Sequence, residues 1–255
     1  MSQATAPRRS FAPLAILGFV LALAALIGAV GAGLGNRMGM WDYRTGLQVF
    51  LRWGAWGGLI AAGISLIGCF TATADRQRRG LSLAAAGIVI GALAFAVPYA
   101  TYTRFQSVAK VWDITTDMVN PPRFVAIVPL RARAPNKPEY RAAQFAPIQK
   151  KAYPDIVPVE LTKSPADAFK AALAVARSFG WAIVASVPTE GRIEATDTTF
   201  WFGFKDDIVI RIAANGSGSR VDIRSYSRLG RNDGGKNAAR VRAYIARLKA
   251  EASAG

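Results

Sequence analysis

The sequence predicts an N-terminal three-helix transmembrane region followed by an exported α+β domain with an antiparallel sheet. Two observations predict this fold class. The N-terminal part contains long uncharged stretches, whereas the C-terminal part contains short apolar runs bounded by turn residues. The predicted organisation is a cytoplasmic tail at 1–10, membrane helices within 11–103, a proline-rich extended segment at 104–158 and the α+β domain at 159–255.

Three uncharged stretches predict the membrane helices. No charged residue occurs in 11–36, 53–74 or 80–103. Each stretch exceeds the ~20 apolar residues that a helix needs to cross a bilayer core. Small residues recur inside them and permit close packing of the helices. The predicted spans are about 12–34, 52–73 and 81–101.

Basic residues in the short loops predict the orientation. They are Arg8, Arg9, Arg76, Arg78 and Arg79, before the first span and between the second and third. The positive-inside rule therefore predicts a bacterial inner-membrane protein with a cytoplasmic N-terminus and a periplasmic C-terminal domain.

The segment from Arg8 to Phe11, with sequence RRSF, also resembles a twin-arginine export signal. The uncharged run after it is longer than a typical signal core, and two further spans follow. We therefore favour a retained membrane helix.

The chain has one cysteine, Cys69, inside the second predicted span, and no histidine. These counts exclude a disulfide in the exported part, Ser–His–Asp and Cys–His catalysis, and histidine-ligated zinc or haem. We expect no cofactor.

The part after Thr103 is basic, with 24 Lys and Arg against 14 Asp and Glu. Such a charge next to a bilayer suggests an anionic lipid or an acidic envelope partner, while the alternative is a solvated basic surface. Nucleic acid is not expected, because the domain is predicted to lie outside the cytoplasm.

The 104–158 segment is interrupted by prolines, which argue against both a long helix and a central strand there. It also contains large apolar residues such as Trp112, Ile114, Phe124 and Phe145. We therefore expect it to pack along the folded domain rather than to form a free linker.

The last part predicts helix, about four antiparallel strands and helix, with both helices flanking one face of the sheet. Ser164 is the expected N-cap of the first helix, with Pro165 and Asp167 in its first turn and Gly180 at its end. The predicted strands are 181–187, 191–204, 207–213 and 220–227, the hairpin turn is 215–219, and the last helix is 235–251.

Two groups of carboxylates are candidate site residues. Asp113 and Asp117, in the sequence DITTD, offer oxygen ligands to a divalent metal, although five residues supply too few ligands and aspartates also cap turns. Asp206 and Asp207 open an apolar strand and face opposite ways, so they cannot act as a paired acid and base. We expect one of them to meet an arginine of the neighbouring strand, which carries Arg224 and Arg228.

The third candidate is the turn before the last helix. Gly230, Gly234 and Gly235 allow left-handed or closely approached backbone there, and the helix start presents free N–H groups. With Arg228 and Arg231 beside it, the turn is suited to an anion. In the alternative interpretation, Asp233 caps the helix and Asp206 and Asp207 neutralise the arginines in a structural network.

At these residues the chain resembles a bacterial family called domain of unknown function 1499. The resemblance rests on DITTD at 113–117, PPRF at 121–124, FGFKDDIVIRI at 202–212 and VDIRSYSRLGRNDGGKNAARVRAYI at 221–245. It covers about 111–248 and implies that the DITTD and PPRF segments belong to the domain. Asn232 stands where the family has serine, and Gly234 where it has a larger residue.

Two functional hypotheses follow. The first is a non-enzymatic inner-membrane protein whose periplasmic domain binds an anionic ligand or a protein partner, or helps to assemble an envelope complex. The alternative is a hydrolase or transferase that uses carboxylates, with or without a divalent metal. Its candidate residues are Asp113, Asp117, Asp206, Asp207 and Asp233.

Overall fold

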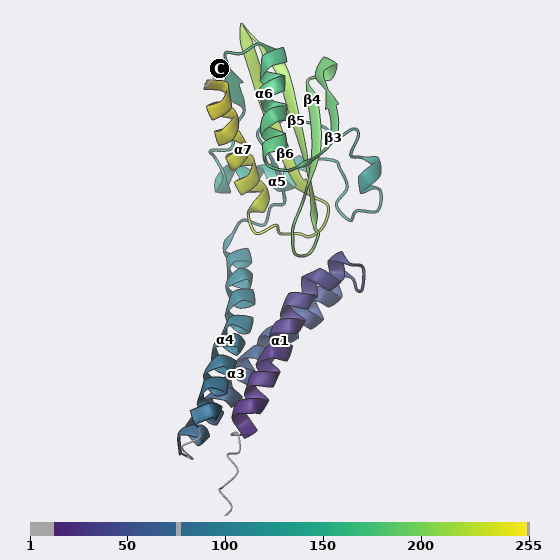
Figure 1. The fold of residues 1–255 in the computed structure, drawn as a ribbon. Helices are drawn as coiled ribbons and strands as arrows, with labels where there is room; N and C mark the ends of the chain where they lie inside the picture. Colours follow the sequence, from purple (N-terminus) through teal and green to yellow (C-terminus); the bar gives the residue numbers. More distant parts are fainter. Residues whose placement is uncertain (1–12, 75–77, 254–255) are drawn as a thin grey trace, which may run out of the picture. The chain divides into compact units, whose positions relative to one another are not determined.

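The structure is a computed structural model that describes residues 13–74 and 78–253 (Figure 1). The predicted tail at 1–10, with Arg8 and Arg9, lies outside the described residues, as does Arg76. The chain divides into two compact units, Met1–Thr103 with Trp201–Gly203 and the remainder of the chain. We describe each unit separately.

The structure contains the three long apolar N-terminal helices that the sequence predicts. They are α1 (Pro13–Arg37), α3 (Arg52–Ala74) and α4 (Arg78–Ser107). Each is long and apolar enough to cross a membrane. The second helical segment begins earlier than predicted, because α2 (Tyr43–Thr45) and the π-helix η1 (Gly46–Leu51) lead directly into α3. The third continues six residues beyond Thr101 to Ser107, because Asp, Pro and Gly are absent there and nothing in this stretch ends a helix.

Small residues bring the membrane helices close together. A Cβ added at Gly58 of α3 would lie 2.8 Å from the carbonyl oxygen of Gly91 in α4. Ser65 of α3 is fully buried, and a Cβ at Gly18 of α1 or Gly87 of α4 would overlap its hydroxyl. These helices approach at distances that larger side chains do not permit.

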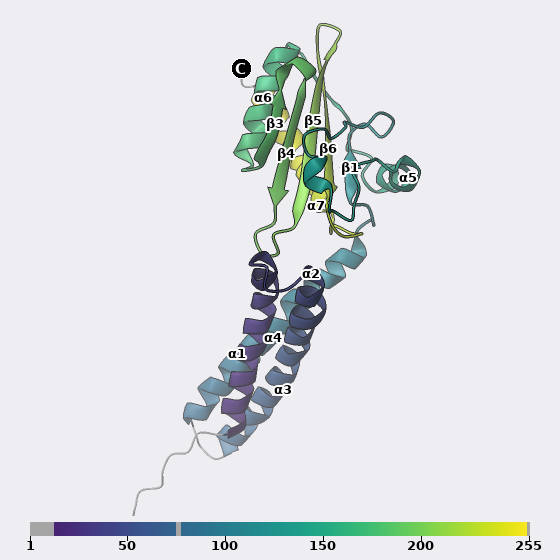
Figure 2. The same ribbon diagram turned by 90° about the vertical axis from the view of Figure 1, so that its right-hand side faces the viewer.

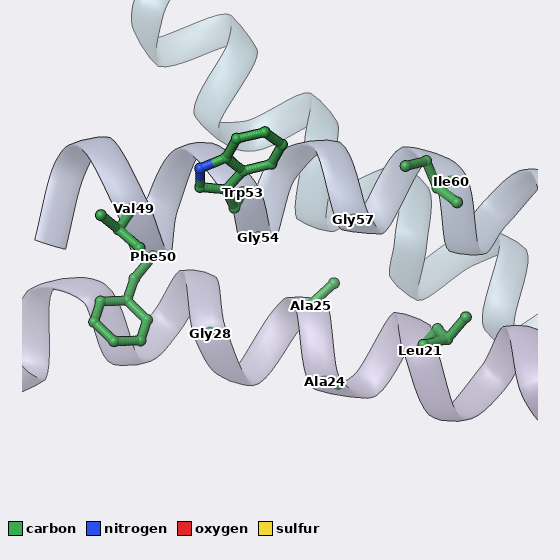
Figure 3. A pocket seen from close by; sticks show the side chains of 10 residues that line it. All are labelled: Leu21, Ala24, Ala25, Gly28, Val49, Phe50, Trp53, Gly54, Gly57 and Ile60. Carbon is green, nitrogen blue, oxygen red and sulfur yellow. The ribbon is translucent and has the colours of Figure 1, made fainter. Parts of the chain in front are cut away.

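An apolar groove of about 370 Å³ lies between α1 and the η1–α3 segment (Figure 3). Figure 3 shows Val49 and Phe50 on one helix facing the same space as Ala25 on the other. Its lining residues are Leu21, Ala24, Ala25, Gly28, Val49, Phe50, Trp53, Gly54, Gly57 and Ile60.

The second unit is built on an antiparallel sheet of six strands in the order β1-β6-β5-β4-β3, with β2 also paired to β6. The strands are β1 (Asp113–Thr115), β2 (Val159–Leu161), β3 (Ala182–Val187), β4 (Arg192–Thr198), β5 (Lys205–Asn215) and β6 (Gly218–Ser227). The prediction of about four strands was therefore too low. Strands β1 and β2 have three residues each, which is too short for a visible alternation, and they form only because the edge of β6 offers partners.

Two helices, α6 (Pro165–Ser178) and α7 (Lys236–Ser253), cover one face of the sheet, as predicted (Figure 1). The Ser164 side chain caps α6 by accepting the N–H of Asp167 at 3.2 Å, and Gly180 follows the helix with a φ of 72°. The apolar side chains of α6, α7 and the sheet form one core cluster with Trp112, Phe124 and others.

The proline-rich segment is packed on the sheet domain and contains an unpredicted helix, α5 (Ala142–Ala152) (Figure 2). This helix forms despite Pro147 in its interior. Two tertiary contacts hold it: Phe145 is fully buried, and the Gln149 side chain exchanges hydrogen bonds of 3.1 and 2.6 Å with the backbone of Thr115. Burial and these bonds offset the one helical hydrogen bond that proline cannot make.

Candidate functional site

Asp113 and Arg224 form a buried ion pair between β1 and β6. Nε and Nη2 of Arg224 donate to Oδ1 and Oδ2 of Asp113 at 2.9 and 2.7 Å. The same guanidinium donates to the carbonyl oxygens of Pro122 and Pro138. The Asp113 and Arg224 side chains are 0% and 2% exposed. One arginine therefore fastens both the DITTD strand and the proline-rich segment to β6.

Asp207 forms a second buried cluster, in which its carboxylate binds two arginines. Its carboxylate accepts from Nη1 of Arg131 at 2.7 Å, from two nitrogens of Arg228 at 2.8 Å each, and from the Thr196 hydroxyl at 2.7 Å. The Asp207 side chain has no exposed surface. Its four hydrogen bonds satisfy the carboxylate inside the domain.

Aromatic rings separate and cover these charges. The Arg131 guanidinium lies 4.3 Å from the ring centre of Tyr226, and that of Arg224 lies 4.9 Å from the ring centre of Phe124. Such cation–π contacts favour the charged arginine away from water. We call Asp113, Arg131, Asp207, Arg224 and Arg228 the arginine–aspartate network.

Asp206 faces the opposite side of β5 from Asp207, as the two-residue period of a strand requires. Its carboxylate accepts from Nη2 of Arg240 in α7 at 2.8 Å, and that guanidinium also binds Asp197 at 2.6 Å. The structure therefore separates the two adjacent aspartates and gives each its own arginine partner.

Asp117 lies in a different cluster from Asp113. Its Oδ2 accepts from Arg211 at 3.1 Å and from Arg220 at 3.0 Å, and its Oδ1 caps the N–H groups of Val119 and Asn120. Among the residues that the structure describes, no group of three or more carboxylate or cysteine side chains is arranged to hold a metal ion. The carboxylates of Asp113 and Asp117, the two candidate metal ligands, each bind arginine instead.

The start of α7 is occupied by the protein's own aspartate. Oδ1 and Oδ2 of Asp233 accept the N–H groups of Gly235 and Asn237 at 2.9 and 2.7 Å. Gly234 and Gly235 take φ values of 65° and 77°, which only glycine adopts readily. The helix start that the sequence offered to an external anion is therefore filled by Asp233.

The same turn contacts the end of α4. The Asn232 side-chain amide donates to the carbonyl oxygen of Phe105 at 2.6 Å, and its Oδ1 accepts the N–H of Gly234. A Cβ on Gly234 would lie 2.7 Å from the Phe105 ring. Asn232 and Gly234 are the two positions where the resemblance implies other residues, and both contact Phe105.

Of the three predicted arginines, only Arg231 remains exposed, because Arg224 and Arg228 are bound to Asp113 and Asp207. Arg228 is therefore no longer a candidate ligand for an external anion. Four further exposed cations lie on segments next to this turn, and within 13–74 and 78–253 none of the five forms an ion pair. We call these five residues the cationic end: Arg104, Lys110, Lys205, Arg231 and Lys236.

Burial shifts several ionisation equilibria in the domain. It raises the pKa of Asp113, against the opposing effect of Arg224, and lowers the pKa of Arg131, against that of Asp207. It also raises the pKa of Tyr140 to about 12, with a further contribution from the Asp113 charge. Burial raises the pKa of Asp233, although backbone N–H groups oppose the shift.

Several members of these clusters were missed from the sequence. Arg131 is one of many arginines in an irregular segment, and Arg240 is one of several on α7, so neither has a local signal. Glu194 is fully buried on β4 and accepts the N–H groups of residues 125–127 at 2.9 to 3.1 Å. These partners are about 70 residues apart in the chain, so only the folded sheet brings them together.

The segments that carry the resemblance therefore meet in one domain. A family model described as "Protein of unknown function (DUF1499)" matches residues 113–248, more than half of the 255-residue chain. The chain belongs to this family. No curated protein matches it. The DUF1499 range begins at Asp113 and contains the whole arginine–aspartate network, so the network lies within the family domain.

Proposed function

We propose that the protein is a non-enzymatic binding or assembly protein of the bacterial inner membrane, whose periplasmic DUF1499 domain recognises an anionic ligand through its cationic end. The observation that carries this proposal is the contrast between two groups of cations. The arginines of the arginine–aspartate network are buried and neutralised by aspartates, whereas the five residues of the cationic end are exposed beside the last residues of α4.

The segments that carry the cationic end are joined by direct contacts. Asn232 bonds to Phe105, which follows Arg104, and a Cβ on Gly235 would lie 3.6 Å from Val108. The N–H of Arg228 donates to the carbonyl oxygen of Lys205 at 3.0 Å, so β5 begins beside the same turn. Nearby cations act together on an anionic surface, each contributing about 1 kcal/mol.

The carboxylates favour a structural role over a catalytic one. All five candidates are engaged: Asp113, Asp206 and Asp207 by arginines, Asp117 by arginines and backbone, and Asp233 by backbone N–H groups. An acid–base pair needs a carboxylate that reaches substrate. Four of the five are less than 10% exposed.

Native mass spectrometry of the full chain, extracted in mild detergent with phosphatidylglycerol or phosphatidylcholine added, tests the proposal. We expect preferential retention of phosphatidylglycerol, which weakens with salt because exposed charges are screened. The double variant Arg231→Ala/Lys236→Ala is expected to lose most of this preference.

The matched control is Arg247→Ala/Lys249→Ala, which removes the same charge from the exposed last turns of α7. Equal retention by both double variants, or retention that is insensitive to salt, contradicts recognition through the cationic end.

A further inference from the structure

Strand β3 (Ala182–Val187) forms one open edge of the sheet. It pairs with β4 on one side, and within 13–74 and 78–253 no strand pairs with its other side. Figure 2 shows β3 as the outermost strand on the side of α6. The opposite edge is different, because the chain covers β6 there with its own short strands β1 and β2. Backbone N–H and C=O groups along the outer side of β3 are therefore left to water or to another chain.

The sequence of β3 carries little of the usual protection against strand addition. The segment AIVASV has no charged residue and no proline, and none of its six residues is fully buried. Proteins commonly protect an edge strand with lysine, proline or a bulge. The pairing with β4 shifts register once, between Ile183 and Ala185, but residues 185–187 pair regularly. This uncharged end of β3 is therefore open to a further strand.

A groove lies beside this end of β3. Its volume is about 710 Å³, and its lining includes Ser186 of β3, Phe169 and Leu173 of α6, and Ile212 of β5. Ser186 therefore faces α6. Because side chains alternate between the two faces of a sheet, every second side chain of a strand added to β3 would lie on the groove side.

The helix α6 brings two cations to this groove. Lys170, Leu173 and Arg177 follow one another at spacings of three and four residues, so they lie along one stripe of the helix. The Lys170 side chain is 78% exposed, and its ion pair with the exposed Asp167 contributes little. Arg177 is exposed and has no ion pair within the part of the chain that the structure describes.

These charges favour an acidic occupant over a second copy of the chain. Glu190, the carboxylate among the residues that line the groove, is already paired with Arg192. A second copy would bring the same excess of cations, 24 Lys and Arg against 14 Asp and Glu after Thr103, and the two domains would repel each other.

We propose that the β3 edge is a docking site for an extended, acidic segment of a partner protein, which adds a strand to the sheet and places alternate side chains in the groove. Main-chain hydrogen bonds to β3 hold the segment, while the groove and the cations of α6 select it. The proposal is independent of the cationic end, because none of the five residues of that end lies on β3 or α6.

Hydrogen–deuterium exchange of the full chain in detergent, followed by mass spectrometry, tests the docking. The probe is a short synthetic peptide of alternating valine and threonine with an aspartate at each end. One control peptide is N-methylated at every valine and threonine, which removes its backbone donors. The other carries lysine in place of both aspartates.

We expect the acidic peptide at saturation to slow amide exchange in 182–187 about tenfold, because the edge amides gain partners. The N-methylated peptide is expected to have no effect. The variant Lys170→Ala/Arg177→Ala is expected to bind the acidic peptide about fivefold more weakly. The matched control, Arg247→Ala/Lys249→Ala on α7, is expected to bind it as the wild type does.

Four results would overturn the proposal. Equal protection by the N-methylated peptide contradicts strand addition, and equal binding of the lysine peptide contradicts selection of an acidic segment. Absence of protection in 182–187 with all of the peptides contradicts docking at this edge. Protection that appears without peptide as the protein concentration rises assigns the edge to a second copy of the chain.

Discussion

At Asp113 and Arg224, a single substitution is expected to lower the stability of the domain strongly. Both side chains are buried and each neutralises the other through two hydrogen bonds. Burying an ion costs free energy, and the attraction of its partner offsets that cost only while the partner is present. Nothing near either residue in the sequence indicates the partner, because they are 111 positions apart.

Asp113→Ala is expected to destabilise the domain by about 3–5 kcal/mol, because it leaves the Arg224 guanidinium buried without a counterion. Chemical unfolding of the detergent-solubilised protein measures this. The control is Asp155→Ala, which breaks the Arg242–Asp155 pair whose side chains are 44% and 53% exposed. That change is expected to cost under about 1 kcal/mol, and equal losses argue against the burial effect.

Asp117 predicts a pH dependence. Burial raises the pKa of its carboxyl. The N–H groups of Asn120 and Val119 and the guanidiniums of Arg220 and Arg211 lower it by more, so the net pKa lies below its ordinary value. The folded protein therefore binds this proton more weakly than the unfolded chain does. The stabilisation is present above the unfolded pKa and is lost as pH falls through the folded pKa.

Asp117→Asn is accordingly expected to be less stable than the wild type at pH 7, and the gap is expected to close as the pH falls below about 4. Thermal unfolding at several pH values between 3 and 7 measures the gap. A gap that is constant with pH means that the charge of Asp117 contributes nothing.

At the scale of elements, the structure follows local signals where they are strong. Ser164, Pro165 and Asp167 predict the start of α6, and the alternation of Ile208, Val209 and Ile210 predicts β5, because caps and strand periods are local properties. Helix α5 and strands β1 and β2 carry no such signal. They depend on partners supplied by β6 and by the core.

The turn before α7 gives a prediction at this scale. Gly234→Ala places a Cβ 2.7 Å from the Phe105 ring in a backbone with φ 65°, whereas Gly216→Ala has φ 57° but nothing within 4 Å. Both are expected to cost about 1–2 kcal/mol for the left-handed backbone. Gly234→Ala is expected to cost more in thermal unfolding, because the ring must also move.

Phe105→Ala is the rescue variant, since it removes the ring that the new methyl group meets. In the Phe105→Ala background, the cost of Gly234→Ala is expected to fall to that of Gly216→Ala. An unchanged cost indicates that the turn does not rely on contact with the end of α4.

At the scale of the whole molecule, the proposed topology has the N-terminus in the cytoplasm and the DUF1499 domain in the periplasm. In a Cys69→Ala background, Ser217→Cys is expected to react with a membrane-impermeant maleimide in cells with a permeabilised outer membrane. Ser2→Cys is expected to react only after the inner membrane is disrupted. The reverse pattern contradicts the positive-inside prediction.

The sequence by itself determined the three long apolar helices, the main hairpin, the ends of α6 and the approximate start of α7. These features depend on local hydropathy, strand period and capping. It also showed that an arginine–glycine turn precedes the last helix. It left open whether those arginines meet the protein's own aspartates or an external anion.

Only the tertiary structure decided that question, residue by residue. Pairing of β1 with β6 puts Asp113 beside Arg224, and closure of the proline-rich segment brings Arg131 to Asp207. Asp233 takes the helix start, and Arg231 is left exposed. The physical reason is that burial selects which charges must be paired, and burial is set by contacts between segments far apart in the chain.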